Sequence, residues 1–278
     1  MKAIPVFMYH HINRHAGDLV TLTPEDFENH LRVLKDRGFQ TLFLDELVRL
    51  LKGKELSSEP SVALTFDDGH LDNWVYAFPL LEKYQMKATI FLITSWMGEG
   101  VKRPRWNPNR QENLPEIPRH KEIKKRVGSG DLSVALNWEE ARAMEAGGLV
   151  DIQSHTHFHR DYFLPEGKML RLDPAQRILM KEDLARSKES IEGRLGKRCR
   201  YLSWPWGKYD SEALSLAKES GFEATVTTEK GVNFPGSNEM TIKRIVAKCG
   251  DKGWFSKRLS IYSHKAVGRL YSHIAGKI

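Results

Sequence analysis

Two adjacent carboxylates, Asp67 and Asp68, directly follow an apolar run in the stretch LTFDDG (64–69). Their like charges repel, and burying either one without a partner would be costly. A divalent cation beside them would offset the repulsion and would also bring the pKa of a nearby water molecule towards neutrality. The alternative is structural, since an aspartate here can cap a helix and interact with its dipole. Capping accounts for one of the two carboxylates more readily than for both.

A pair of histidines, His155 and His159, lies four residues apart in the stretch SHTHFH (154–159). On a helical turn this spacing places both imidazoles on one face, whereas His157 between them points away. Two neutral imidazoles and one carboxylate are a common ligand set for Zn²⁺ or another first-row divalent ion. The pair alone is weak evidence, because the same spacing also occurs without a metal.

Short, nearly continuous apolar runs alternate with amphipathic helical patterns along the chain. Such runs are typical of parallel strands that are covered on both faces. They span residues 4–10, 41–44, 62–66, 88–93, 149–154, 200–204 and 223–228. Seven strand–helix units in this length favour an α/β barrel over a doubly wound sheet. In a barrel, functional side chains gather at the carboxyl ends of the strands. Five candidates fall there: His10, Asp67, Asp68, His155 and Trp206.

Two segments interrupt the alternation, within an expected barrel domain over residues 1–250. Residues 97–133 are rich in proline, glycine and charge, which predicts a long loop over one rim. Residues 251–278 carry six Lys or Arg and one acidic residue. On a helical wheel the apolar and basic residues of this tail separate. It could therefore lie on an anionic membrane surface, or pack on the barrel with a solvated basic face.

The chain of 278 residues has a formal net charge of +7 and 40% hydrophobic residues. A folded core is therefore expected, and the charge suits an anionic partner such as an acidic glycan or a membrane surface. Nucleic-acid binding would rest on charge alone and is rejected. Cys199 and Cys249 show neither metal-type spacing nor a disulfide framework. The first apolar run is too short for a signal peptide, so we expect a cytoplasmic protein, at most peripheral at the inner membrane face.

The stretch VALTFDDGHLDNWVYAFPLLEKYQMKATIFL (62–92) is followed by SHTHFH and then by an aromatic-Pro-aromatic-Gly segment. In this order the motifs resemble the polysaccharide deacetylases, the NodB-homology group or carbohydrate esterase family 4. The resemblance covers roughly residues 4–245. It implies a distorted, NodB-like (β/α)7 barrel and the metal-dependent removal of an acetyl group from a sugar.

Carried over residue by residue, the resemblance implies that Asp67 is the general base and Asp68 a metal ligand. His155 and His159 are the other two protein ligands that it implies. Zn²⁺ is the expected ion, with Co²⁺ or Ni²⁺ as alternatives.

The third motif of the family is R-x-P-[YFW]-G, and here it reads Ser203-Trp204-Pro205-Trp206-Gly207. The resemblance implies that the backbone N–H of Trp206, next to Pro205, helps to bind the oxyanion of the tetrahedral intermediate. Ser203 replaces the arginine that orients the catalytic aspartate in the family. This motif therefore leaves the pKa control of Asp67 unexplained, although poly-N-acetylglucosamine deacetylases share the replacement.

The general acid of the family is a histidine in an L-x-H motif, and we predict no strand after residue 245 that could carry it. In the circularly permuted poly-N-acetylglucosamine deacetylases the motif lies on the N-terminal strand. Met8-Tyr9-His10 looks like this arrangement. The resemblance thus implies His10 as the acid, with Tyr9 beside it at the substrate site. His11 should face the other way.

Three functions stay open at this point. The leading one is a metal-dependent hydrolase that removes an N-acetyl group from a sugar of a cell-surface polysaccharide or of its lipid-linked precursor. The second is a related hydrolase acting on a formyl sugar or a non-sugar amide. The third is a non-catalytic carbohydrate-binding barrel, against which the complete set of candidate site residues counts.

Overall fold

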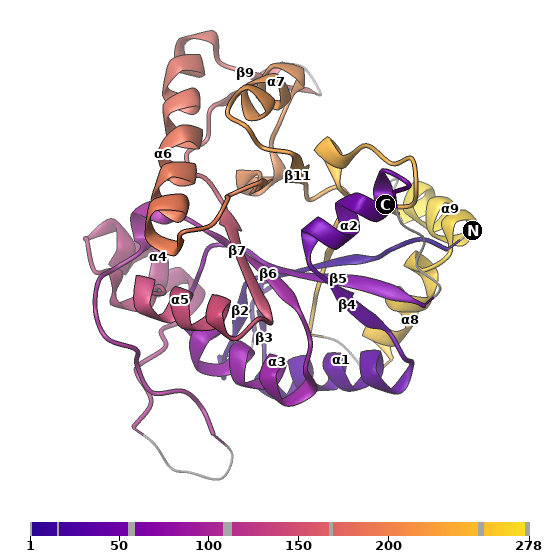
Figure 1. Ribbon diagram of the computed structural model, residues 1–278, viewed down its shortest axis with the longest axis horizontal. Helices are drawn as coiled ribbons and strands as arrows, with labels where there is room; N and C mark the ends of the chain where they lie inside the picture. Colours follow the sequence, from indigo (N-terminus) through magenta and orange to yellow (C-terminus); the bar gives the residue numbers. More distant parts are fainter. Residues whose placement is uncertain are drawn as a thin grey trace.

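A curled sheet of parallel strands forms the centre of the molecule, with helices around it (Figure 1). The computed structural model describes residues 2–15, 17–54, 59–107, 113–166, 169–249 and 253–275. The strands are β1 (Val6–Tyr9), β4 (Gln40–Leu42), β5 (Ser61–Phe66), β6 (Ala88–Leu92), β7 (Val150–Ser154), β10 (Tyr201–Ser203), β11 (Ala224–Val226) and β12 (Ile245–Val246). Their order is β11-β10-β7-β6-β5-β1-β12, and β4 also pairs with β5. The predicted distorted barrel is confirmed.

All seven predicted strands are present, and β12 is an addition that the sequence did not indicate. It pairs with β1 through Ile245 opposite Phe7. Just upstream, the backbone of Ile242 exchanges hydrogen bonds with Thr225 and Thr227 at the end of β11. The segment 242–246 therefore bridges the two edges of the sheet and narrows the opening of the barrel. Its two-residue strand is too short to give a recognisable apolar run.

The predicted helices cover the sheet. They are α1 (Pro24–Asp36), α2 (Leu44–Leu51), α3 (Phe78–Tyr84), α5 (Trp138–Ala146), α6 (Arg177–Leu195) and α7 (Ser211–Glu219). At the start of α1 the Thr23 hydroxyl accepts a hydrogen bond from the amide of Asp26, and Pro24 takes the first helical position. A π-helical turn, Asn73–Ala77, precedes α3.

The segment 97–133, predicted as a long loop, contains the helix α4 (His120–Gly128). Among its residues only Ile123 is buried, so the apolar periodicity that signals a helix is weak. Residues 108–112 of this segment lie outside the described residues. Two short pairs of strands were also not predicted: β2 (His11–Ile12) with β3 (Thr21–Leu22), and the hairpin of β8 (Phe163–Glu166) and β9 (Met169–Leu172).

The basic tail forms two helices, α8 (Trp254–Tyr262) and α9 (Lys265–Ala275). Phe255 of α8 is buried, and its ring centroid lies 4.6 Å from that of Phe7 in β1. This half of the tail therefore packs on the barrel. In contrast, α9 leaves large apolar side chains exposed. Residues 251–252 and 276–278 lie outside the described residues. Across the described ranges, no helix combines the length and apolarity needed to cross a bilayer.

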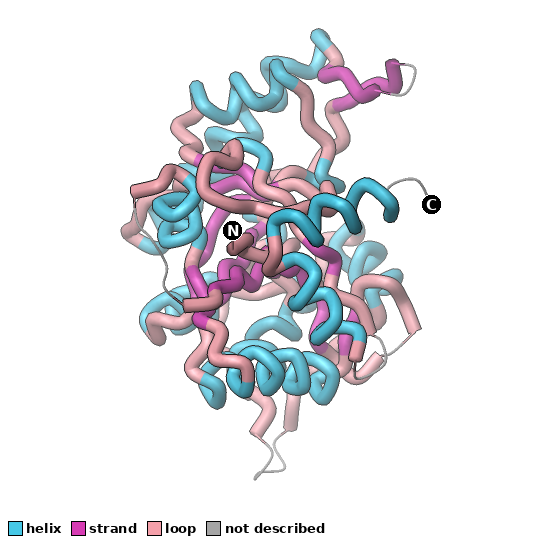
Figure 2. Tube along the Cα trace, turned by 90° about the vertical axis from the view of Figure 1, so that its right-hand side faces the viewer, coloured by secondary structure: helices cyan, strands magenta, loops and turns pink. Residues whose placement is uncertain are grey.

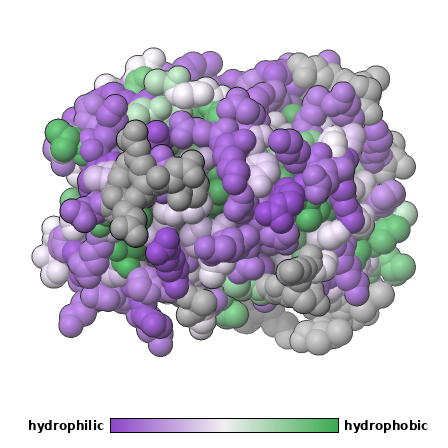
Figure 3. All heavy atoms as spheres, turned by 90° about the horizontal axis from the view of Figure 1, so that it is seen from below, coloured by the Kyte–Doolittle hydropathy of each residue, from purple (hydrophilic) through white to green (hydrophobic). Residues whose placement is uncertain are grey.

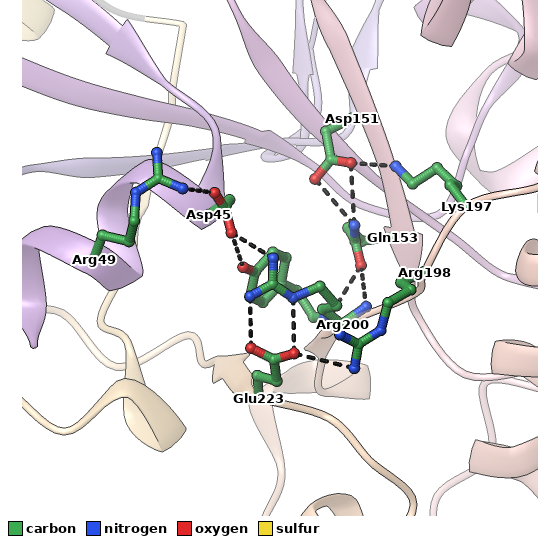
Figure 4. Close-up of polar contacts among 9 residues, drawn as sticks. Asp45, Arg49, Asp151, Gln153, Lys197, Arg198, Arg200 and Glu223 are labelled. Carbon is green, nitrogen blue, oxygen red and sulfur yellow. Dashed lines mark hydrogen bonds and ion pairs between the residues drawn. The ribbon is translucent and has the colours of Figure 1, made fainter.

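A polar network ties α2 to the far edge of the sheet, where β4 and β11 are not paired within the described residues (Figure 4). Arg200, just before β10, donates to both carboxylate oxygens of Glu223, at 2.8 and 2.6 Å, and also to Asp45 of α2. The side-chain carbonyl of Gln153 accepts hydrogen bonds from the amides of Arg200 and Tyr201. These contacts take the place of strand pairing on this side of the barrel.

A buried histidine in α1 predicts a specific loss of stability in acid. The His30 ring stacks on Phe255, and its Nδ1 lies 3.1 Å from the Tyr9 hydroxyl. Burial lowers the pKa of His30 to about 3 from an ordinary 6.5. Between these values the unfolded chain binds one more proton than the native protein, so the unfolding free energy falls as the pH decreases from 6.5. At pH 4.5 the expected loss is about 3 kcal/mol.

Urea unfolding at pH 7 and pH 4.5 measures this loss, with His30→Gln as the matched variant. The variant should be less sensitive to pH than the wild type. An identical pH dependence for the two proteins would show that His30 is not the titrating group.

Candidate active site

Three candidate metal ligands meet at the carboxyl ends of the strands. Asp68 follows β5, while His155 and His159 follow β7. Oδ1 of Asp68 lies 3.3 Å from Nε2 of His155 and 3.9 Å from Nε2 of His159. One ligand atom from each of the three side chains lies within 4.8 Å of the others. The structure thus brings together the carboxylate and the two imidazoles that the spacing and the strand ends suggested.

This donor set fits a divalent cation. Ligand atoms about 2 Å from one ion stand roughly 3–4 Å from each other, as the Asp68 oxygen and each histidine nitrogen do. Nδ1 of His155 lies 2.8 Å from the carbonyl oxygen of Ser203, which fixes the tautomer and leaves Nε2 facing the site. Burial lowers the pKa of His159 to about 4, so its imidazole is neutral and has a free lone pair. Two nitrogens and one carboxylate suit zinc and its neighbours in the first row.

The backbone around these side chains adopts a conformation that is rare for residues with a Cβ. Of the described non-glycine residues with positive φ, all but the helix-ending Gln85 lie in the site segments. They are Asp68 (φ 76°), Thr156 (66°), His159 (52°) and Trp206 (54°). Such backbone strain persists only where the surrounding structure holds it, and it is concentrated at functional sites.

Two glycines allow the close packing of the site loops. Gly69, which follows the two aspartates, has φ 77°, and a Cβ there would lie 2.5 Å from Cδ2 of Leu92. Gly207, which follows Trp206, has φ 70°, and a Cβ would lie 2.1 Å from Oγ1 of Thr228. Both positions therefore require glycine for conformation and for space.

Asp67 is held by an arginine that comes from the other end of the sequence. Nη1 and Nη2 of Arg244 each lie 2.7 Å from one carboxylate oxygen of Asp67. Arg244 stands just before β12, is fully buried, and also donates from Nε to the carbonyl oxygen of Thr227. Nη2 of Arg244 lies 3.0 Å from the Ser203 hydroxyl, which in turn donates to Asp67 at 3.2 Å. Arg244 thus supplies the orienting guanidinium that is missing at position 203.

The arginine also sets the charge of Asp67. Burial raises the pKa of this carboxyl, but the Arg244 guanidinium and its hydrogen bonds outweigh burial and hold the pKa below its usual value. Asp67 is therefore ionised at neutral pH and can accept a proton. For His10, burial lowers the pKa, although the charges of Asp68 and Asp67 partly oppose it. An imidazole kept neutral at rest must acquire a proton before it can donate one.

A cavity of about 440 Å³ opens at this rim. It is lined by the candidate residues His10, Asp67, Asp68, His155, His159 and Trp206. The Trp206 ring is 48% exposed, and its centroid lies 4.3 Å from that of His159. Pro205 is buried and does not line this cavity. Further lining residues that the sequence did not predict include Trp96, shortly after β6, and His120 and Lys124 of α4.

The prediction that Tyr9 contributes to the substrate site is wrong. Its side chain is 1% exposed, and its hydroxyl lies 3.1 Å from Nδ1 of His30 in the core. Successive side chains of a strand point to opposite faces. Met8 and His10 line the cavity, and therefore Tyr9 between them points into the packing with α1.

A cluster of buried histidines connects α4 to the rim. Nδ1 of His11 lies 2.8 Å from Asp72, and its Nε2 lies 3.1 Å from Nδ1 of His120 at the start of α4. His70 stacks on His11, with centroids 3.7 Å apart, and places Nε2 3.0 Å from Oδ2 of Asp68. Because the two rings are nearly parallel, their nitrogen lone pairs do not converge on one point. We interpret the cluster as a hydrogen-bonded support for α4 and Asp68, which the sequence did not reveal.

Comparison with known proteins agrees with this site. The sequence model of the family described as polysaccharide deacetylase matches residues 54–225, more than half of the chain. A Bacillus subtilis (strain 168) protein provisionally named polysaccharide deacetylase YxkH is 29% identical over 250 residues, covering 90% of this chain and 73% of that protein. The poly-β-1,6-N-acetyl-D-glucosamine N-deacetylase of Staphylococcus aureus (strain MRSA252) is 26% identical over 228 residues, covering 81% of this chain and 67% of the relative.

Solved structures share the fold. The Streptococcus pyogenes deacetylase PplD in complex with acetate superposes with a TM-score of 0.72 at 23% identity, covering 94% of this chain and 98% of that one. IcaB from Ammonifex degensii has a TM-score of 0.72 at 20% identity, covering 95% and 98%. At these identities the likeness concerns the fold. With its matching family region and its curled barrel, the chain belongs to the polysaccharide deacetylase family and is a hydrolase.

Proposed function

We propose that this protein is a metal-dependent N-deacetylase acting on N-acetylglucosamine units of a polysaccharide. The observation that supports this proposal best is the geometry of one cavity. An ionised Asp67, which forms two hydrogen bonds with Arg244, lies there next to the candidate metal ligands Asp68, His155 and His159. The name of the staphylococcal relative supports N-acetylglucosamine as the substrate unit.

Asp68, His155 and His159 would hold the ion. When bound, a divalent ion polarises the acetyl carbonyl and acidifies a water molecule. The protein side chains supply the remaining chemistry. His70 donates to the second oxygen of Asp68 and so keeps the ligand carboxylate in place, while Ser203 does the same for His155 through its carbonyl group.

Asp67 is proposed to remove a proton from the attacking water, and Arg244 holds its carboxylate in the orientation for this transfer. The Trp206 amide is proposed as a donor to the oxyanion of the tetrahedral intermediate. The leaving nitrogen needs one proton, and water loses one, so the exchange balances within the site. His10 is the residue proposed to relay that proton, because it lines the same cavity as Asp67: its neutral imidazole takes up the proton that Asp67 removed from water and delivers it to the leaving nitrogen.

We also propose that the substrate belongs to a cell-surface polysaccharide or its lipid-linked precursor, and that the protein works in the cytoplasm at the inner membrane face. Both described cysteines, the buried Cys199 and the exposed Cys249, are free thiols. Free thiols suit a reducing compartment. Cell fractionation with an antibody against the full chain tests this location, and recovery outside the cytoplasmic and inner-membrane fractions would contradict it.

Acetate release from a panel of substrates tests the proposed reaction. The metal-loaded enzyme is expected to release acetate from poly-β-1,6-N-acetylglucosamine oligomers, with chitin oligomers, a lipid-linked N-acetylglucosamine and an N-formyl sugar as comparisons. The apoprotein with Zn²⁺, Co²⁺ or Ni²⁺ added back gives the metal preference. Formate release without acetate release would favour the related amide hydrolase. Binding of oligomers without any release would favour the carbohydrate-binding barrel.

A further inference from the structure

A second cavity, of about 590 Å³, lies at the other end of the barrel from the catalytic rim. Its wall includes Asn233, whose side-chain amide donates to the carbonyl oxygen of Ile4, ahead of β1, and to that of Lys243. His10 of the catalytic rim follows the opposite end of the same strand. The two cavities are therefore separated by the length of β1.

This basal cavity is lined by cations and by no carboxylate from the described part of the chain. Lys230, Lys243 and Arg269 are the charged lining residues, and His273 also lines the cavity. Within the described ranges none of these three cations has a carboxylate oxygen within 4.0 Å. Like charges gathered around a hollow repel one another, and an anion in that hollow removes the repulsion.

The ring of Phe234 at the cavity wall contacts two cations of α9, of which Arg269 lines the cavity. The centroid of the Phe234 ring lies 3.7 Å from Nζ of Lys265 and 4.6 Å from Cζ of Arg269. Cation–π contacts of this kind attract a positive charge without neutralising it. Both side chains are thus positioned on Phe234, and the Arg269 guanidinium keeps its charge available to a ligand in the cavity.

Two glycines shape this end of the molecule. A Cβ at Gly231 would lie 2.3 Å from Cδ of Lys243, so the lysine stem lies directly over this backbone. A Cβ at Gly268 would lie 2.3 Å from Cγ1 of Val232, so α9 approaches the cavity loop closely only because position 268 has no side chain. The positions of the lysine and of α9 therefore follow from packing.

Two large apolar side chains of α9 are exposed, on either side of Arg269 in the sequence. Val267 is 51% exposed and Leu270 is 64% exposed, one helical turn apart. In Figure 2 the N-terminus and α9 lie at the same end of the molecule, facing the viewer. Figure 3 shows a largely hydrophilic surface with separate groups of hydrophobic atoms, some of them at the right-hand edge.

We propose that this end of the barrel binds an anionic lipid bilayer, with a headgroup phosphate in the basal cavity and with Val267 and Leu270 in the interface. A soluble anion would account for the cations alone. The bilayer accounts also for the exposed apolar side chains Val267 and Leu270, because a basic cluster beside exposed apolar side chains is the arrangement of peripheral membrane helices.

The arrangement has a consequence for substrate access. From Ile4 to His10 the chain advances by about 20 Å along the strand direction. The catalytic rim therefore faces away from the bilayer, at a distance that a glycan chain several sugars long can reach. This orientation favours a polymer as the substrate over a sugar that is directly attached to a lipid. The proposed membrane binding does not depend on the deacetylase reaction.

Vesicle co-sedimentation of the full chain tests the proposal. Vesicles of phosphatidylcholine with about 30% phosphatidylglycerol are compared with pure phosphatidylcholine vesicles at the same ionic strength. Arg269→Glu is expected to lower partitioning onto the anionic vesicles by at least about fivefold, since each basic residue near such a surface contributes about that factor. Leu270→Ser should also lower it. Lys218→Glu on α7, with the same change in charge outside the basal cavity, is the matched control.

Acetate release from a soluble oligomer is measured in parallel and should be unchanged by Arg269→Glu, so a failure of the reaction and a failure of membrane binding are distinguishable. Equal partitioning of Arg269→Glu and Lys218→Glu would overturn the proposal. Equal binding of the wild type to neutral and anionic vesicles would also overturn it. Binding of inorganic phosphate without vesicle binding would replace it with a soluble-anion site.

Discussion

Replacing Asp67 by asparagine is expected to leave the protein folded and able to bind its divalent ion, but to lower kcat by about 10²–10⁴-fold. The reason is that the amide cannot take a proton from water, whereas the ligand set on Asp68 is unchanged. Asparagine keeps one carbonyl oxygen as an acceptor for Arg244, so the buried guanidinium retains a hydrogen bond. Acetate release and elemental analysis of the same preparation give the two readouts.

His155→Ala is the contrasting variant, because it removes a ligand nitrogen. It is expected to lose both bound metal and turnover, while Asp67→Asn loses turnover alone. A melting temperature for each variant separates these effects from unfolding. Turnover by Asp67→Asn at the wild-type rate would show that Asp67 is not the base.

The ligand set could be proposed from the sequence because its members follow predictable strands. The runs 62–66 and 149–154 are continuous, apolar and flanked by helical patterns, so they read as parallel strands. The carboxyl ends of parallel strands share one edge. It follows that Asp68 and His155 lie at the same edge of the sheet, whatever the details of the loops. The resemblance then supplied the roles, which the strand pattern alone did not distinguish.

Other parts of the site depend on contacts that no local pattern shows. Arg244 lies far from Asp67 in sequence. The two side chains meet because the segment 242–246 bridges β11 and β1 and so brings Arg244 to the end of β5. One signal was available, namely a single arginine in front of the apolar residues Ile245 and Val246. A charged residue at the start of a buried run needs a partner, and Asp67 was the carboxylate without one.

For α4 the difficulty was different. Its position at the cavity depends on a series of hydrogen bonds from Asp72 to His11 and from His11 to His120. These three polar residues come from three segments; Asp72 and His11 are buried, and His120 is half-buried. Hydrophobic periodicity carries no information about such a polar anchor. The error at Tyr9 was avoidable, since assigning His10 to the cavity places Tyr9 on the other face of β1.

Replacing Arg244 by methionine is expected to lower kcat/KM by at least about 100-fold, because Asp67 loses both its orientation and the charge that keeps it ionised. Burial then raises the pKa of Asp67, and of the opposing causes only the charges of His155 and His10 are left. The base is active when ionised, so the acid limb of the pH–rate profile should move to higher pH. Leaving a buried carboxylate without its partner should also lower the unfolding free energy by about 3–5 kcal/mol.

Arg244→Lys separates the contributions of charge and geometry. Lysine restores a positive charge but has no planar fork for two parallel hydrogen bonds, so it should recover most of the pH profile and only part of the rate. Guanidinium chloride added to an Arg244→Ala variant, at concentrations below those that unfold it, should raise the rate if the cavity left by the side chain admits the ion. A methionine variant with reduced stability but an unshifted acid limb would mean that Arg244 supports the fold and does not tune Asp67. The shift of the acid limb is therefore the decisive measurement, because a purely structural residue has no reason to move it.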